Sequence, residues 1–265
     1  MAAYTGDVAG LVTSWAGSGN STLIATSNAP MEFALTYRAP DVQTTPLSTG
    51  IIANTAIPNI RDWEVAIKGR LNPAKLGNTG IVTFTGGYVL NVKDWKVDLA
   101  WEPQKATSMS ASAVTANSFI PGILTWGGNF TGFADTGTGI EPPGEDAATL
   151  TLVLANLATD LQLSGSAFTT QVQSTVAPGK IVEYAYDFRG TGDLTSQAGS
   201  SPYSTFLWSD GAIPKPTAGS LVLTSYTGRT YTGDAFMKSM SITVTLENII
   251  MIDIVAQGSG ALTIA

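Results

Sequence analysis

The sequence contains neither cysteine nor histidine. Without cysteine, disulfide bonds and thiolate metal sites are excluded. Without histidine, the commonest general base and the commonest transition-metal ligand are missing. Ser-His-Asp hydrolysis, Cys-His catalysis and zinc chemistry therefore have no residues to perform them. We expect a protein that is not an enzyme, with no catalytic residue, no metal site and no cofactor.

Charged residues are also scarce, at 12% of 265 residues, and the net charge is −7 at pH 7. Such a chain is not expected to bind the outside of a nucleic-acid duplex, because neutralising phosphates requires clustered Lys and Arg. A surface that DNA passes without sticking remains compatible with this charge. No run of 18 apolar residues is present, so no membrane span is expected. The first residues also lack the basic start of a signal peptide.

Carboxylate-only chemistry is the one catalytic alternative that the composition leaves open. Asp94, Asp98 and Glu102 lie on one face of an expected strand. Paired carboxylates serve as acid and base in glycosidases at separations of about 5–10 Å. Lys93 and Lys96 stand among these carboxylates, which favours exposed ion pairs over a catalytic cleft.

What the chain does have is alternation of apolar with polar residues. It is clearest over residues 32–38 and 94–102, where large apolar side chains recur at every second position. This period of two predicts strands with one packed and one solvated face. The 28 Gly and 13 Pro are spread along the chain, which indicates frequent turns. The sequence therefore predicts a mainly β fold.

Two phrases occur twice. Residues 165–168 (Gly-Ser-Ala-Phe) and 190–195 (Gly-Thr-Gly-Asp-Leu-Thr) reappear with substitutions 68 residues later, as 233–236 (Gly-Asp-Ala-Phe) and 258–263 (Gly-Ser-Gly-Ala-Leu-Thr). A phrase that runs from Ile-Pro to Trp and then Gly returns 63 residues later, whereas the strand before it matches better at an offset of 64. The residues that mark the two phrases are Ile57, Pro58, Trp63 and Gly69, then Ile120, Pro121, Trp126 and Gly132, then Phe168, Gly190 and Gly192, and finally Phe236, Gly258 and Gly260.

The order of the repeats predicts two related, interleaved modules. Both tryptophan phrases lie in the first half of the chain, and both glycine phrases lie in the second. If each module contains one of each, an inner module spans 88–196, and an outer module consists of 20–87 plus 197–265. Within the glycine phrase we expect a hairpin of 167–176 and 181–188. Its second copy returns through the apolar run 249–255, which is expected to be buried on both faces, within the fold or against a neighbouring subunit.

Ligand sites are weakly supported by the same residues. Gly190-x-Gly192 and Gly258-x-Gly260 lack the third glycine and the following helix of a phosphate loop, so turns or strand ends are favoured. Asp187, Asp193 and Glu145-Asp146 do not form a calcium-binding loop sequence.

Three segments taken together resemble the phage tail tube proteins. They are residues 89–99 (Val-Leu-Asn-Val-Lys-Asp-Trp-Lys-Val-Asp-Leu), residues 117–133 with Ile-Pro-Gly, Trp and Phe-x-Gly, and residues 165–195 ending in Gly-Thr-Gly-Asp-Leu-Thr. The resemblance covers about 88–196. Residues 28–69 and 233–263 are similar to second copies of its opening and closing parts.

The resemblance implies a major tail tube protein of a long-tailed bacteriophage. Such proteins are β-sandwich or barrel-like modules whose strands join neighbours into a closed ring, and the rings stack into a tube through which the genome leaves the capsid. The family usually has one module per chain and six chains per ring. Two modules in one chain then imply a trimeric pseudo-hexamer, with a hexamer as the alternative.

The resemblance also implies a place in the virion tail, assembly in the host cytoplasm, and contact with a tape measure protein and other tail proteins. DNA would pass through the lumen without specific binding, and the sequence assigns no residues to that lumen. Two other functions fit the chain. One is another tail component, such as a tail terminator or baseplate hub. The other is a carbohydrate-binding β-sandwich adhesin. However, Trp63, Trp95, Trp101 and Trp126 occupy alternating strand positions with aliphatic neighbours, which favours core or subunit packing over sugar stacking.

Overall fold

The computed structural model describes residues 11–15, 32–38, 41–44, 55–58, 62–76, 82–84, 91–106, 117–133, 144, 147–153, 162–197, 211–225, 228–245 and 249–265. Within these ranges the regular structure is entirely β. The strands are β1 (Leu11–Trp15), β2 (Glu32–Arg38), β3 (Asp41–Thr44), β4 (Thr55–Pro58), β5 (Asp62–Leu76), β6 (Val82–Phe84), β7 (Asn91–Lys105), β8 (Phe119–Phe133), β9 (Ala148–Val153), β10 (Gln162–Thr175), β11 (Glu183–Gln197), β12 (Gly211–Ala212), β13 (Gly219–Thr224), β14 (Thr230–Thr245), β15 (Ile249–Gly258) and β16 (Thr263–Ile264). The predicted mainly β fold is confirmed.

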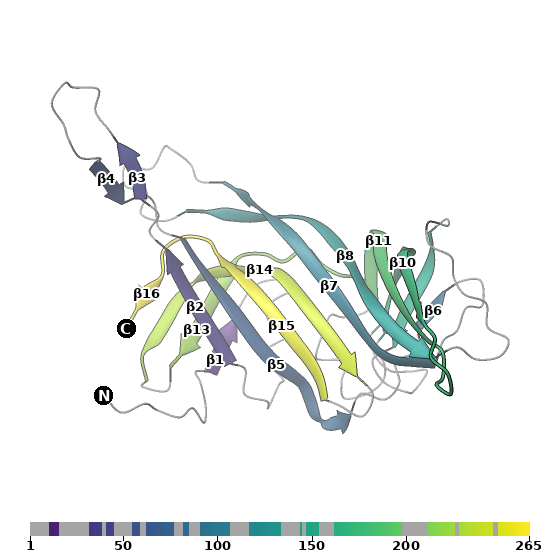
Figure 1. Ribbon diagram of the computed structural model, residues 1–265. Helices are drawn as coiled ribbons and strands as arrows, with labels where there is room; N and C mark the ends of the chain where they lie inside the picture. The colour runs from purple at the N-terminus through teal and green to yellow at the C-terminus, as the bar shows by residue number, and fades with distance from the viewer. Residues whose placement is uncertain are drawn as a thin grey trace.

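Fourteen strands form one antiparallel sheet. Its main path runs β2-β5-β15-β14-β7-β8-β11-β10-β9-β6, and the long central strands lie side by side in Figure 1. The small hairpin β3–β4 forms a separate two-stranded sheet that projects from it. The main sheet is open, because β2 and β6 end the path without pairing with each other. A closed ring is therefore not a property of the single chain.

Strands close together in the sheet come from nested parts of the sequence. β7, β8, β11, β10 and β9 are consecutive along the path and all lie within residues 91–197. β2, β5, β15 and β14 are also consecutive, but they come from the two sides of that segment. The two groups meet where β14 pairs with β7. β6 and β12 pair with β9 and β11, although the predicted boundaries assign both short strands to the outer module.

β14 is the strand at which the sheet branches. Its first part, from Thr230 to Ala235, pairs with β13, which in turn pairs with β1. Its second part, from Ser239 to Thr245, pairs with β7. The register of β14 against β15 shifts between Met237 and Ser239, at the change of partner. A bulge of this kind bends the strand and lets two neighbours share one edge.

Alternating side chains from both groups of strands form one hydrophobic core. Trp63, Trp95, Trp101 and Trp126 are 2%, 1%, 1% and 4% exposed, which confirms that these aromatics pack inward. Trp15 of β1 joins them, and its indole Nε1 donates a 3.0 Å hydrogen bond to the Ala235 carbonyl. Buried tryptophans contribute large apolar areas, and a partner for the indole N–H removes the cost of burying it.

The two glycine-phrase strand pairs have the same register. In β10–β11, Ala167 lies opposite Gly190 and Thr175 opposite Glu183. In β14–β15, the residues 68 positions later face each other, and the register shifts at the corresponding place. The predicted hairpin is present, with Pro178 and Gly179 in its turn.

The pairs made by the tryptophan strands also correspond. Gly132 of β8 lies opposite Tyr184, and Gly69 of β5 lies opposite Ile252. Trp126 lies opposite Leu99, and Trp63 opposite Tyr37. Leu99 and Tyr37 differ by 62 in residue number rather than by the 64 that the sequence favours. A slip of two residues keeps every side chain on the same face, so the alternation alone does not distinguish the two alignments.

The apolar run 249–255 is buried on only one face in the single chain. Ile250, Ile252 and Ile254 are at most 5% exposed, whereas Met251 between them is 37% exposed. Burial of this strand on both faces within the fold is therefore wrong. The physical reason is that β15 turns one face to the core and the other outward.

Candidate assembly sites

Trp126 of β8 lies over two glycines of the neighbouring strands. A β-carbon on Gly165 would lie 2.6 Å from Cζ2 of the indole, and one on Gly190 would overlap the ring. The indole Nε1 donates a 3.1 Å hydrogen bond to the carbonyl of Gly192. Phe188 packs against the same indole edge-on, with ring centroids 6.3 Å apart. Only glycine permits so close an approach of an aromatic ring to strand backbone.

Trp63 of β5 has the same surroundings. A β-carbon on Gly233 would lie 2.6 Å from Cζ2 of the indole, and one on Gly258 would overlap the ring. The indole Nε1 donates a 3.1 Å hydrogen bond to the carbonyl of Gly260. The amide of Gln257 adds a contact of its own, a 3.3 Å hydrogen bond to the Trp63 carbonyl.

Each acceptor glycine has a left-handed backbone, with φ of 72° at Gly192 and 105° at Gly260. Glycine adopts that conformation at no steric cost, so the backbone favours glycine at the second position of each Gly-x-Gly pair. The nearby indole favours glycine at the first position. Gly190 and Gly258 lie inside β11 and β15 and make room for an indole, rather than forming a turn or a phosphate loop. The sequence identified these residues as repeated, but it did not indicate their contact with tryptophan.

The other marker residues are spread along the same strands. Ile57 and Pro58 lie in β4, opposite Val42 and Asp41. Pro121 is buried and lies opposite Pro103, while Ile120 is 53% exposed. Gly69 and Gly132 are buried, Phe236 is buried, and Phe168 is half-buried. These residues support the strands and do not converge on a single pocket.

The carboxylates singled out in the sequence have local partners. Asp94 accepts a 2.6 Å hydrogen bond from the Thr131 hydroxyl. Asp98 pairs with Lys96 at 2.9 Å, and both side chains are largely exposed. Asp187 and Asp193 are exposed, and Glu145-Asp146 lies outside the described residues. In the part of the chain that the structure describes, no three Asp or Glu side chains are grouped as metal ligands.

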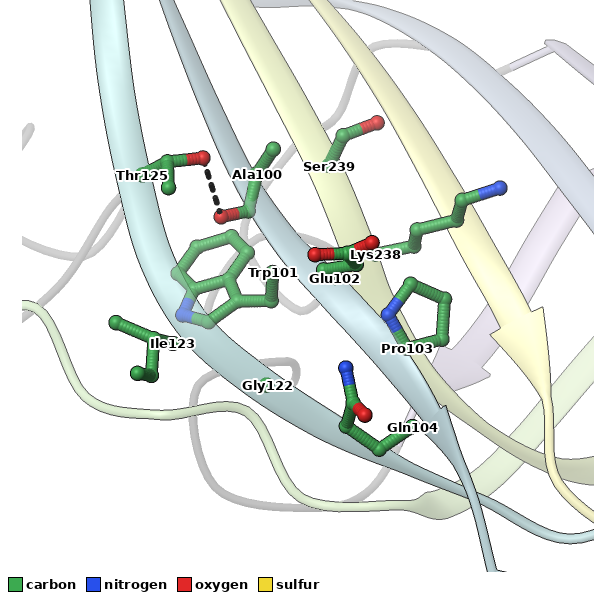
Figure 2. Close-up of a pocket in the computed structure, with 10 residues that line it drawn as sticks. All are labelled: Ala100, Trp101, Glu102, Pro103, Gln104, Gly122, Ile123, Thr125, Lys238 and Ser239. Carbon is green, nitrogen blue, oxygen red and sulfur yellow. Dashed lines mark hydrogen bonds between the residues drawn. The ribbon is translucent and has the colours of Figure 1, made fainter.

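An open groove of about 760 Å³ lies beside the junction of β7, β8 and β14. Figure 2 shows Thr125 of β8 bonded through its hydroxyl to the Ala100 carbonyl of β7, at 3.4 Å. Lys238 reaches the groove from β14, but its ammonium pairs with Glu64 at 2.8 Å. The lining is otherwise mostly apolar or backbone, with Ile123 86% exposed at its rim. The groove marks where the strand registers shift, and no constellation of ionisable groups converges in it.

Among the strand edges that have no strand partner in the described residues are the outer edge of β2 and the second part of β10. β2 ends the sheet path on one side. β9 pairs with β10 only as far as Ala167. The rest of β10 pairs with β11 on one side and has no strand on the other side among the described residues. Large apolar side chains are exposed at Tyr37 of β2, by 43%, and at Val176, the residue directly after β10, by 72%. Unpaired edges of this kind template pairing with another chain.

Comparison with protein-family models and with curated proteins finds no match for this chain. In the ranges that the structure describes, there is no helix of the length and hydrophobicity that crossing a membrane requires.

Proposed function

We propose that this protein is a structural protein of a bacteriophage tail, which self-assembles into closed rings that stack as the tail tube. The tube would conduct DNA during ejection. The proposal starts from the resemblance of residues 88–196 to phage tail tube proteins, and the structural observation that supports the duplicated module is the repeated tryptophan–glycine site. Two indoles occupy matching positions over matching glycines, within strand pairs of matching register.

The proposal includes an internal duplication in nested order. The inner module, about 88–196, consists of the group β7 to β11, and the outer module of 20–87 plus 197–265 consists of β2, β5 and β13 to β15. Support comes from the strand order, in which each tryptophan strand lies between a preceding strand and the return strand of a glycine-phrase hairpin. β6 and β12 belong with the inner module by their pairing.

The way in which the two groups meet supports the proposed ring formation. Within one chain, an edge of the outer group joins an edge of the inner group through β14 and β7, while β2 and the second part of β10 have no strand partner on one side among the described residues. If the same joint forms between chains, every chain has a partner for both of these edges only when the assembly closes into a ring. Three chains would supply six modules, so a trimeric pseudo-hexamer is favoured over a hexamer of chains.

The composition fits such a conduit. The net charge of −7 repels DNA, which allows it to slide through a lumen without being held. Partners would be other copies of the chain, a tape measure protein and other tail proteins. The location would be the virion tail after assembly in the host cytoplasm.

The test is negative-stain imaging of the purified protein together with native mass measurement of its smallest closed assembly. We expect stacked rings or tubes, and a ring mass of three chains. A protein that stays monomeric at high concentration would contradict the proposal. Rings that never stack would instead indicate a tail terminator or baseplate hub. The adhesin alternative has little support, because the tryptophans on β1, β5, β7 and β8 are buried and offer no stacking platform.

A further inference from the structure

The β14–β7 joint is a template for contact between chains. Ser239–Thr245 of β14 pair with residues 94–100 of β7, antiparallel and without a break in register. On the packed face, Met240 lies opposite Leu99, Ile242 opposite Val97, and Val244 opposite Trp95. All six of these side chains are at most 1% exposed. The joint therefore buries a continuous apolar row.

Two stretches correspond to the two sides of this joint, β2 at one end of the sheet path and residues 171–177, which begin in β10 beyond its pairing with β9, and neither has a strand partner on its outer side among the described residues. The matched strand registers relate β14 to β10 and β7 to β2, so residues 171–177 correspond to 239–245, and Glu32–Arg38 to 94–100. The Gly144 N–H donates a hydrogen bond to the Thr169 carbonyl, which covers β10 only up to the start of that stretch. β2 has the same length as the part of β7 that forms the joint.

Residues 171–177 and β2 differ from the internal joint in the exposure of their apolar side chains. Val244 is 1% exposed, whereas the corresponding Val176 is 72% exposed. Leu99 is 1% exposed, whereas the corresponding Tyr37 is 43% exposed. Residues 171–177 and β2 therefore expose apolar side chains at positions where the internal joint buries them, and the opposite edge of a second copy would cover these side chains.

We infer that residues 171–177 of one copy pair antiparallel with β2 of the next copy, in the register of the β14–β7 joint. The inference rests on the proposed ring assembly and specifies its contact. Backbone hydrogen bonds of both edges would be completed, as in other cases of strand addition. The predicted pairs are Gln171 with Arg38, Val172 with Tyr37, Gln173 with Thr36, Ser174 with Leu35, Thr175 with Ala34, Val176 with Phe33 and Ala177 with Glu32.

A second contact extends the same template. Within the chain, the Ser259 hydroxyl donates to the Phe119 carbonyl and accepts from the Phe119 N–H, each at 3.1 Å. Thr191 corresponds to Ser259 and retains the hydroxyl, and Ala56 of β4 corresponds to Phe119. Within the chain, the Thr191 hydroxyl donates a 3.4 Å hydrogen bond to the Ser166 carbonyl. A contact with the Ala56 backbone of the next copy would require this hydroxyl to change partner.

Cysteine cross-linking tests the register directly, because the natural chain has no cysteine. Thr36→Cys with Gln173→Cys introduces thiols at two exposed, predicted partners. Residues opposite each other in an antiparallel pair have β-carbons about 4.5–5.5 Å apart, near the range that a disulfide spans. After oxidation with diamide, we expect a ladder of linked chains on a non-reducing denaturing gel, ending at the number of chains in the ring. A ladder that ends at three supports both the pairing and the trimer, and one that ends at six supports the pairing with a hexamer.

Two matched variants serve as controls. Asp98→Cys with Ser241→Cys replaces an opposed pair of the internal joint and is expected to form a disulfide within one chain. Thr36→Cys with Ser174→Cys places the thiols on opposite faces and is expected to give no ladder. If rings form and the internal pair links, but Thr36→Cys with Gln173→Cys does not, the proposed pairing is wrong while the ring assembly stands. If no assembly forms at all, the proposed function fails, and the inference with it.

A charge substitution gives an independent measurement. Val176→Lys is expected to abolish rings at concentrations where the natural protein forms them, with no change in the thermal unfolding of the dissociated chain. Ile264→Lys makes the same change at a side chain that is 54% exposed but lies on β16, away from the joint. Rings that persist in Val176→Lys would overturn the proposed pairing.

Discussion

Gly190 lies directly beneath the indole of Trp126, so close that a β-carbon on the glycine would overlap the ring. The same relationship holds between Gly258 and Trp63. A glycine in a strand normally weakens a sheet, because it increases the backbone entropy that is lost on folding and has no side chain to pack. Here the absence of a side chain leaves space for the indole next to the strand backbone. The indole N–H of Trp126 donates a hydrogen bond to the carbonyl of Gly192, the second glycine of the pair.

The first prediction concerns the two indoles. Trp63→Ala and Trp126→Ala should each lower the free energy of unfolding by about 3–5 kcal/mol, because each removes a buried aromatic and leaves a cavity. Denaturant unfolding of the dissociated chain measures both. Ile264→Ala, at an exposed apolar position, should change stability by less than about 0.5 kcal/mol. If one tryptophan variant is as stable as the natural chain, the two sites are not equivalent.

The second prediction concerns the glycines. Gly190→Ala and Gly258→Ala should each cost about 1–3 kcal/mol, because the added methyl group displaces an indole from a packed position. The sharper measurement is a double-mutant cycle. Gly190→Ala in the Trp126→Ala background should lose most of its cost, since the methyl group then enters the vacated space. Equal costs in both backgrounds would show that the glycine is needed for some other reason.

The third prediction concerns the ion pair between Lys238 and Glu64. Lys238 of β14 reaches past β15 to pair with Glu64 of β5 at 2.8 Å, but both side chains are about a third exposed. Solvent screens such pairs, so Glu64→Gln should cost no more than about 1 kcal/mol, and less at high salt. A much larger loss, unaffected by salt, would mean that the pair is buried in the assembly.

The fourth prediction uses backbone amide exchange. Amides in the 239–245 stretch of β14 should be protected in both the dissociated and the assembled protein, because strands flank it on both sides. In residues 171–177, the amides that point away from β11 should gain protection only on assembly. Equal exchange of the 171–177 stretch in both states would place the contact between chains elsewhere.

Local patterns predicted much of this fold, and the limits have a physical cause. Alternation indicated the strands around Phe33 and Trp95, and the turn residues indicated the hairpin at Pro178-Gly179. The repeats identified Trp63 and Trp126 as a pair. Each of these signals is carried by residues that are close together in sequence.

The pairings that organise the sheet could not be read in the same way. The joint between β14 and β7, and the offset of 62 rather than 64, depend on hydrogen bonds between segments far apart in the chain. Alternation repeats every two residues, so it fixes which face a side chain occupies but not which residue lies opposite. For the same reason the contact of Gly190 with Trp126 emerged only from the three-dimensional arrangement.

The pairing of β5 with β15 has a consequence for synthesis. Leu76 ends β5, and Ile249 begins the strand that covers it. At roughly 5–20 residues per second, the ribosome needs about 9–35 s to make the intervening residues. β7, β8, β10 and β11 emerge during that wait and can pair among themselves. The inner group of strands can therefore pair while the outer group still lacks β14 and β15. These last long strands to be made then enter the middle of the sheet. A chain released early would lack its centre rather than its end.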